Sequence, residues 1–211
     1  MNARQKHLHD QEALAVAAFK EHEIKQESEG RWLIMKPGTG VFWTEIICTH
    51  HQGLYVDGDI DPVVFRYGPE HPLARVSWMG KRPHAWDGYF REKACIGMGG
   101  RGQDDVLHYF DRDVAICDVE QIIEDVRDSS DIRDLSERQV RLMDALRDDV
   151  IGMMRMSDEF DPVDVYRELY KLDMWEDCDR IGRVPSNRMF YAHAALQRLH
   201  QLLVERGDYD S

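Results

Sequence analysis

Three aspartates at alternate positions are the first candidates for chemistry in this sequence. They follow an apolar run in the segment GLYVDGDIDPVVF, which spans residues 53–65, and are Asp57, Asp59 and Asp61. Oxygen ligands at alternate positions begin a calcium-binding loop, but that loop needs glycine where Pro62 stands and glutamate where Gly68 stands. An aspartate nucleophile for phosphoryl transfer follows a strand of a parallel sheet, whereas tight turns are predicted here. We therefore predict a turn whose carboxylates accept backbone hydrogen bonds, and we keep the three aspartates only as weak metal-ligand candidates.

A glycine-rich loop with the sequence GMGGRG is the second candidate. Gly97, Gly99 and Gly102 match the G-x-G-x-x-G pattern of dinucleotide-binding proteins, with Gly100 and Arg101 between them. That pattern has meaning only between a strand and a helix, and the preceding FREKACI is more typical of a helix end. Dinucleotide binding is therefore not predicted. The backbone amides and the arginine make the loop a candidate anion site.

Ten histidines and four cysteines form no recognisable metal or nucleophile motif. His193 and His200 share a helix face but are seven residues apart, too far to bind one ion. Cys48 and His50 share a strand face, yet no third group that would orient the pair can be assigned. The motifs H-E-x-x-H, G-x-S-x-G, G-x-x-x-x-G-K and C-x-x-C are all absent. We therefore predict no catalytic residue and no cofactor, and we favour a protein that is not an enzyme.

The formal net charge of -13 comes from one part of the chain. Between Asp104 and Asp179 the sequence has 24 acidic and nine basic residues, whereas the other parts are close to balanced. This excess argues against nucleic acid as a partner of that surface, and it favours either a solvated outer face of several helices or a partner with a basic surface. The residues that we predict to bind such a partner are Asp128, Asp131, Asp134, Asp148 and Asp149.

An antiparallel sheet is predicted in the amino-terminal half. A helix to about Glu27 precedes it, because the first residues include a run of good helix formers. Three extended stretches rich in Trp, Ile, Val and Phe follow: Arg31–Lys36, Val41–Thr49 and Leu54–Val56. The PGTG sequence at 37–40 predicts a tight hairpin, and residues 50–53 predict a second turn.

Helices are predicted for most of the remaining chain. Capping signals place three of them, since Ser136 with Gln139 forms a capping box, Asp161 precedes a proline, and Ser186 begins the last helix. The predicted helices are Pro72–Met79, Ala85–Ala94, Asp113–Val126, one that follows Ser136, one from Pro162 to about Trp175, and a last one ended by Gly207. One face of the last helix carries Met189, His193, Leu196, Leu199 and Leu203.

These elements predict an α+β protein with an amino-terminal helix, a small antiparallel meander of three to four strands, and a helical carboxy-terminal majority. The 211 residues, 43% of them apolar, can bury one sizeable core. We expect an α+β region at 1–103 and an acidic helical region at 104–211, packed together as one compact unit. The charged amino terminus lacks the apolar segment of a signal peptide, and no window is apolar enough to span a membrane. The expected location is the cytoplasm, with no membrane partner.

The amino-terminal half also resembles a group of small uncharacterised proteins that bacteriophages and prophages encode. The likeness covers about residues 30–118, in the stretches GRWLIMKPGTGVFWTEIICTHHQGLYVDGDIDPVVFRYG, YFREKACIG and DDVLHYFDRDVA. The matching positions are Arg31, Trp32, Pro37, Gly38, Thr39, Gly53, Leu54, Val56, Gly58, Asp59, Glu92 and Lys93. The chain departs from the group at Gly40, where serine is more frequent, and at His50 and His51. The resemblance implies shared ancestry and a place in the cytoplasm of a bacterial host, and it implies no catalytic residue.

We therefore expect a non-catalytic, phage-type accessory protein whose acidic helices bind and block a host macromolecule. A counter-defence (anti-CRISPR) role would fit, because carboxylates compete for sites made for phosphate. The expected partner is a host protein or complex with a basic surface, without direct contact to nucleic acid. Two alternatives stay open: a small enzyme or ligand-binding protein that uses a metal or nucleotide at the glycine loop and the three aspartates, and a virion or assembly protein. A homodimer also stays open.

Overall fold

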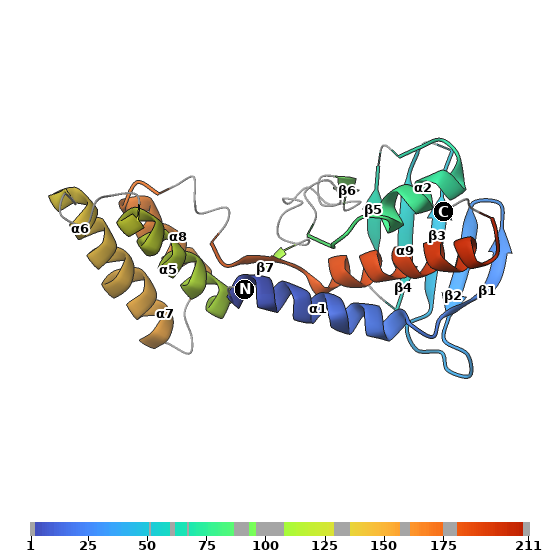
Figure 1. Cartoon of the computed structure of the whole chain (residues 1–211), viewed down its shortest axis with the longest axis horizontal. Coiled ribbons are helices and arrows are strands. Elements are labelled where there is room, and N and C mark those ends of the chain that lie inside the picture. The colour runs from blue at the N-terminus through green and yellow to red at the C-terminus, as the bar shows by residue number, and fades with distance from the viewer. Residues whose placement is uncertain are drawn as a thin grey trace. The chain divides into compact units, whose positions relative to one another are not determined.

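The computed structural model of the chain describes residues 3–50, 52–59, 62–66, 68–86, 93–95, 108–128, 136–156, 161–174 and 181–208. They belong to two compact units, whose elements are labelled in Figure 1: the helical unit, Met1–His7 with Tyr109–Val184, and the sheet unit, Leu8–His108 with Pro185–Ser211. The amino-terminal helix, the antiparallel sheet and the further helices confirm the predicted α+β class. No helix in the described part of the chain has the length and apolar character needed to cross a membrane.

The sheet is an antiparallel meander in which each strand pairs with its neighbours along the chain. This confirms the predicted topology, although the sheet has more strands than expected. Within the described residues its six strands are β1 (Glu23–Ser28), β2 (Arg31–Met35), β3 (Thr44–Cys48), β4 (Leu54–Gly58), β5 (Val63–Phe65) and the two-residue β6 (Ala94–Cys95). Ala94 was predicted to lie in a helix, and that prediction is wrong. Most of that predicted helix, residues 87–92, lies outside the described residues.

The edge strand β1 was not predicted, and the first helix ends at Phe19 instead of near residue 27. The β1 sequence EIKQES has one apolar side chain, Ile24, and is otherwise made of residues that are common in helices or caps. Pairing with β2 overrides this local preference. Ser28 lies opposite Arg31 across a two-residue turn, where Gly30 adopts a φ of 70° that glycine accepts readily.

The connection between β2 and β3 spans residues 36–43, so the predicted tight hairpin and the predicted strand start at Val41 are both wrong. Phe42 has a φ of 56°, which no strand residue adopts. Its carbonyl oxygen accepts a hydrogen bond from Nε2 of His22 at 2.9 Å, and its ring centroid lies 6.3 Å from that of Phe19. Tertiary contacts with the end of the first helix therefore shape this loop.

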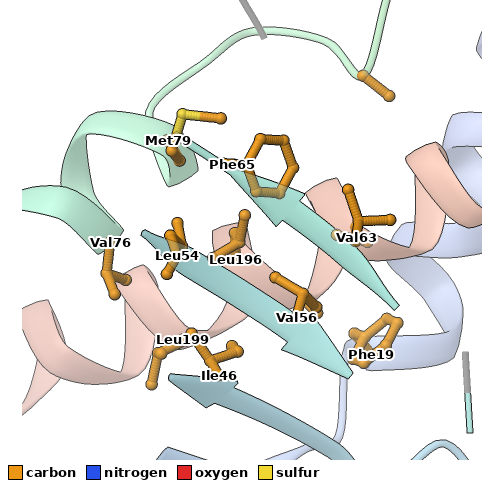
Figure 2. Packing of buried hydrophobic residues seen from close by; sticks show 14 of the residues in the cluster. Phe19, Ile46, Leu54, Val56, Val63, Phe65, Val76, Met79, Leu196 and Leu199 are labelled. Carbon is orange, nitrogen blue, oxygen red and sulfur yellow. The ribbon is translucent and has the colours of Figure 1, made fainter. Parts of the chain in front are cut away.

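Three helices cover one face of the sheet: α1 (Ala3–Phe19), α2 (Pro72–Gly80) and α9 (Asn187–Glu205) (Figure 1). Figure 2 shows their apolar side chains meeting those of the central strands in one buried cluster, which includes Phe19, Ile46, Leu54, Val56, Val63, Phe65, Val76, Met79, Leu196 and Leu199. The five residues predicted on one face of the last helix are all buried. Because that face packs on the sheet, α9 belongs to the sheet unit, although the expected boundary at residue 103 grouped it with the acidic helices.

The helical unit contains α5 (Arg112–Asp128), α8 (Pro162–Lys171), and a continuous helical segment formed by α6 (Glu137–Ala145), the π-helical η1 (Leu146–Ile151) and α7 (Gly152–Met156). Their inward side chains form a second apolar cluster, which includes Val119, Ile123, Leu146, Val150, Met154, Val165 and Leu169. A separate two-stranded sheet pairs β7 (His108–Phe110) with β8 (Arg183–Pro185).

The three helix starts predicted from capping residues are confirmed, with one difference in their chemistry. The capping box of α6 is formed, since Ser136 Oγ accepts from the amide of Gln139 and the side chain of Gln139 accepts from the amide of Ser136. Asp161 Oδ1 caps α8 by accepting from the amide of Val163 at 2.9 Å. Ser186 occupies the N-cap position of α9, but its side chain makes no capping hydrogen bond.

Candidate functional site

The outer face of α5 carries a line of carboxylates, which we call the acidic stripe. Its members, at successive spacings of seven, four and four residues, are Asp113, Glu120, Glu124 and Asp128, and all four are exposed. These spacings place side chains on the same side of an α-helix. The opposite side of α5 is buried in the helical unit through Val119 and Ile123. Helix packing therefore orients the stripe toward solvent.

The acidic stripe is electrostatically unfavourable for its own helix. Glu120, Glu124 and Asp128 are separated by four residues each, and like charges at this spacing destabilise a helix by about 0.2–0.5 kcal/mol per pair. Asp128 also stands at the carboxyl end of α5, where the helix dipole disfavours negative charge, although Arg127 in the same turn offsets part of this effect. Helix stability alone does not account for this arrangement.

Local ion pairs neutralise other acidic residues of the helical unit more completely than the stripe. Arg141 pairs with Glu137, Arg167 with Asp164 and Lys171 with Glu168, each within one helical turn. In the stripe, Glu120 accepts from Arg155 at 2.7 Å. Among the described residues, no cation lies within 4.0 Å of the carboxylates of Glu124 or Asp128. These two charges remain available to a partner.

A hollow of about 400 Å³ adjoins the amino-terminal part of the stripe. It lies between α5 and α7, and its lining includes Asp113, Glu120, Ile116, Cys117 and Met154. Burial raises the pKa of the Cys117 thiol, and the carboxylate of Glu120 and two neighbouring aspartates raise it further. The negative potential around α5 therefore favours the neutral thiol form of Cys117.

The structure separates the five acidic residues predicted from the sequence. Asp128 ends α5, while Asp148 and Asp149 lie on the exposed side of η1, between the buried Leu146 and Val150. Asp148 and Asp149 therefore belong to a different element from Asp128. Asp131 and Asp134 lie outside the described residues. Of the five, only Asp128 belongs to the acidic stripe. The other three members were missed, although their spacing of seven and four residues could have revealed them.

Asp57 lies in β4, opposite Glu45 of β3, and not in the turn that was predicted after Val56. Asp57 Oδ1 accepts a hydrogen bond from the amide of Gly58 at 2.8 Å, and the amide of Asp59 donates to the carbonyl oxygen of Trp43. Asp61 and the loop residues Gly97, Gly99, Gly100, Arg101 and Gly102 lie outside the described residues. Among the residues that the structure describes, no three His, Cys, Asp or Glu side chains are grouped so that they could hold a metal ion.

Cys48 and His50 line one pocket of about 390 Å³, together with Glu29 and Glu70. The Cys48 Sγ donates to the carbonyl oxygen of Pro72 at 3.7 Å. Burial raises the pKa of this thiol to about 11, although the nearby guanidinium of Arg75 opposes the shift. At neutral pH Cys48 is therefore a thiol and a poor nucleophile, which argues against cysteine catalysis here.

A carboxylate and two histidines that sequence analysis did not connect meet in the sheet unit. Glu12 Oε2 lies 2.9 Å from Nδ1 of His84, and Glu12 Oε1 lies 3.6 Å from Nδ1 of His193. Because a carboxylate only accepts, Nδ1 of His84 carries the hydrogen, and its ring stacks on Trp86 at 4.4 Å between centroids. The cluster links α1, α9 and the segment after α2. Only folding brings these residues together, so no local sequence signal could have found them.

Comparisons with protein-family models, with curated proteins and with solved structures found no match. The resemblance to phage- and prophage-encoded proteins therefore stays a prediction.

Proposed function

We propose that this protein binds a macromolecule with a basic surface, and that the acidic stripe of α5 makes the contact. The observation that supports this proposal is the like-charge spacing of Glu120, Glu124 and Asp128 on one exposed helix face. A partner that supplies Lys or Arg side chains converts repulsion within the helix into attraction across the interface.

The spacing along α5 defines the geometry of such a partner. Carboxylates four residues apart are about 6 Å apart along the helix axis, at a rise of about 1.5 Å per residue. The phosphates of one nucleic-acid strand have a comparable separation, so a groove that binds a nucleic-acid backbone presents cations at a similar interval. The acidic stripe therefore suits a nucleic-acid-binding groove on another protein.

In its specific form, the proposal is a phage-type accessory protein that blocks a host defence complex by occupying its nucleic-acid groove. The resemblance of residues 30–118 to phage and prophage proteins supports a role inside a bacterial host. The negative charge of α5 supports a basic groove as the surface that it binds. The contact is non-catalytic, and it weakens as salt screens the charges.

Affinity capture with matched variants tests the proposal. The tagged protein is captured with its partner from a bacterial host lysate at low and at high salt, beside Glu124→Lys and Asp128→Lys. We expect the wild type to retain a partner at low salt and to lose it at high salt, and each reversal to reduce binding of the purified partner at least tenfold. Binding should also compete with nucleic acid for the same groove.

The control is Glu23→Lys, which makes the same charge change on the exposed edge strand β1 of the sheet unit. This variant should bind as the wild type does. Equal binding by the two α5 variants and by the wild type, or binding that is insensitive to salt, would show that the acidic stripe is not the interface.

A further inference from the structure

His84 is held between a carboxylate and an indole ring in the sheet unit. Its Nδ1 lies 2.9 Å from Oε2 of Glu12, and its ring stacks on Trp86, with the two ring planes 3° apart and the centroids 4.4 Å apart. A carboxylate only accepts, so the hydrogen of the neutral imidazole is on Nδ1. The hydrogen bond fixes the tautomer, and the stacking fixes the plane of the ring. The free lone pair of His84 is therefore on Nε2.

Glu12 is itself fixed by contacts on its other oxygen. Its side chain is 15% exposed, and Oε1 accepts from the amide of Ala85 at 3.3 Å. Nδ1 of His193 lies 3.6 Å from the same oxygen. Nε2 of His193 donates to the carbonyl oxygen of Arg82 at 2.9 Å, and this bond ties the segment that carries His84 to α9. The carboxylate is thus held at Nδ1 of His84 from several sides.

The opposite nitrogen of His84 is accessible. The His84 side chain is 38% exposed, and its Nε2 is neither buried nor hydrogen-bonded to another residue that the structure describes. The ring of His9 lies beside the stack, with its centroid 5.6 Å from that of His84 and 5.3 Å from that of Trp86. A small molecule in solution can therefore reach a lone pair whose direction is fixed.

An imidazole in this arrangement is a nucleophile. When Nε2 forms a bond to an electrophile, the ring keeps its Nδ1 hydrogen and becomes positively charged, and the carboxylate of Glu12 stabilises that charge. Two of the three residues before His84 are the cations Lys81 and Arg82, so the segment attracts anionic donors more than neutral ones. A phosphoryl group fits both conditions, because its donors are anionic and a phosphorylated imidazole persists in neutral water.

We propose that His84 is a phosphorylation site, whose Nε2 accepts a phosphoryl group from a small donor such as phosphoramidate or an acyl phosphate. The Nε2 lone pair forms the bond to phosphorus. The bond from phosphorus to the leaving group breaks, and its electron pair departs with the leaving group, as ammonia or as a carboxylate. Glu12 is a positioning residue, because it touches His84 and not the donor. The site lies in the sheet unit, apart from the acidic stripe, so this inference goes beyond the proposed function.

Phosphoramidate alone tests the site on the full chain. After incubation at neutral pH, tandem mass spectrometry identifies the phosphorylated residues, and phosphorus NMR distinguishes Nε2 from Nδ1. We expect His84 to be phosphorylated on Nε2 at least tenfold faster than His71. His71 is the control within the same molecule, because it is exposed and forms no ion pair with a carboxylate that the structure describes. In concentrated urea the two rates should become equal, since unfolding separates Glu12 from His84.

Two substitutions of Glu12 separate the effect of its charge from the effect of the tautomer. Glu12→Gln can still accept from Nδ1 but has no negative charge, so it should slow phosphorylation of His84 at least threefold. Glu12→Ala removes both effects and should lower the rate to that of His71. Glu21→Gln is the matched control, because Glu21 is an exposed carboxylate that pairs with Lys36, and it should leave the rate unchanged. The thermal unfolding transition of each variant shows whether it is folded.

Three outcomes would overturn the inference: equal rates at His84 and His71 in the native protein, phosphorylation of His84 on Nδ1, and a rate at His84 that folded Glu12 variants retain. The comparison of wild type in buffer and in urea decides even where a Glu12 variant does not fold. Capture of the partner through α5 does not depend on any of these results. The two proposals can therefore fail separately.

Discussion

Nη1 of Arg75 lies 2.7 Å from the carbonyl oxygen of Gly53 and holds the β3–β4 turn against α2. The same guanidinium also donates to the carbonyl oxygens of Thr49, Pro69 and Glu70. Arg75 is 1% exposed. A buried cation with four backbone acceptors connects two loops and a helix in the sheet unit, so its removal leaves several buried carbonyl groups without donors.

We expect Arg75→Met to lower the free energy of unfolding by at least about 3 kcal/mol, because a buried acceptor without a donor costs about 1–3 kcal/mol. Chemical denaturation measures this change. Arg31→Met is the control, since Arg31 is exposed and pairs with Glu45 at 2.6 Å on the sheet surface. Its loss should be below about 1 kcal/mol. Similar losses in the two variants would contradict the role assigned to Arg75.

Gly58 is the last residue of β4, beside the aspartates considered as metal ligands, and its backbone conformation requires glycine. Its φ is 139°, and a Cβ atom there would lie 2.1 Å from the carbonyl oxygen of Trp43. We expect Gly58→Ala to destabilise the protein by at least about 2 kcal/mol, through strain and displacement of the β3 start. Gly40→Ala has open space around its Cβ position and should be neutral, or stabilising by up to about 1 kcal/mol. Thermal unfolding of the two variants measures the difference in stability. An equal effect of Gly58→Ala and Gly40→Ala would contradict the requirement for glycine at position 58.

His22 should make stability depend on pH. Its ring is fully buried, and this burial lowers its pKa below the usual 6.5. The cations of Arg198 and Lys36 lower the pKa further, whereas hydrogen bonds to the backbone of Phe42 and Phe19 oppose the shift. Because the folded-state pKa lies below that of the unfolded chain, the unfolded chain takes up the proton first as the pH falls. The contribution of His22 is therefore complete above about pH 6.5 and decreases as the pH falls toward the folded-state pKa.

Denaturation at about pH 7.5 and about pH 5.5 measures this effect. The free energy of unfolding of the wild type should fall between the two, and His22→Gln should show a smaller fall because it cannot take up the proton. His200 also has a lowered pKa, caused mainly by burial and further by Lys81, so a residual fall should remain. An unchanged pH dependence in His22→Gln would exclude His22 as its source.

The acidic stripe predicts opposite effects on stability and on binding. Glu124→Gln with Asp128→Asn removes two like-charge pairs and a charge at the carboxyl end of α5, so it should stabilise the helical unit by about 0.5–2 kcal/mol. The same double variant should bind the basic partner at least tenfold more weakly. Denaturation and binding measured on one preparation give both numbers. A double variant that loses stability would show that these carboxylates serve the fold instead of a partner.

The features that were predicted correctly from the sequence are those with strong local signals. The capping box at Ser136, the aspartate cap at Asp161 and the buried face of α9 follow from side-chain chemistry within a few residues. The antiparallel meander follows from β-branched and aromatic stretches separated by glycine- and proline-containing segments. These signals need no distant contact, so they can be read before folding is considered.

The candidate sites were harder to predict. The acidic excess of the helical region was visible, but the choice among its carboxylates depended on which side of α5 is buried. Asp148 and Asp149 were chosen with Asp128 although they lie on a different element. The aspartates near β4 drew attention by their spacing alone, and the structure uses Asp57 as an acceptor for its neighbouring amide.

The starts of the capped helices, the position of the excess charge and the class of fold can all be predicted from the sequence, because capping, net charge and hydrophobic period are properties of short segments. Contacts in the folded protein are what make EIKQES an edge strand and bring Glu12 to His84. These outcomes depend on contacts between distant parts of the chain, whose free energies exceed the small differences in local preference.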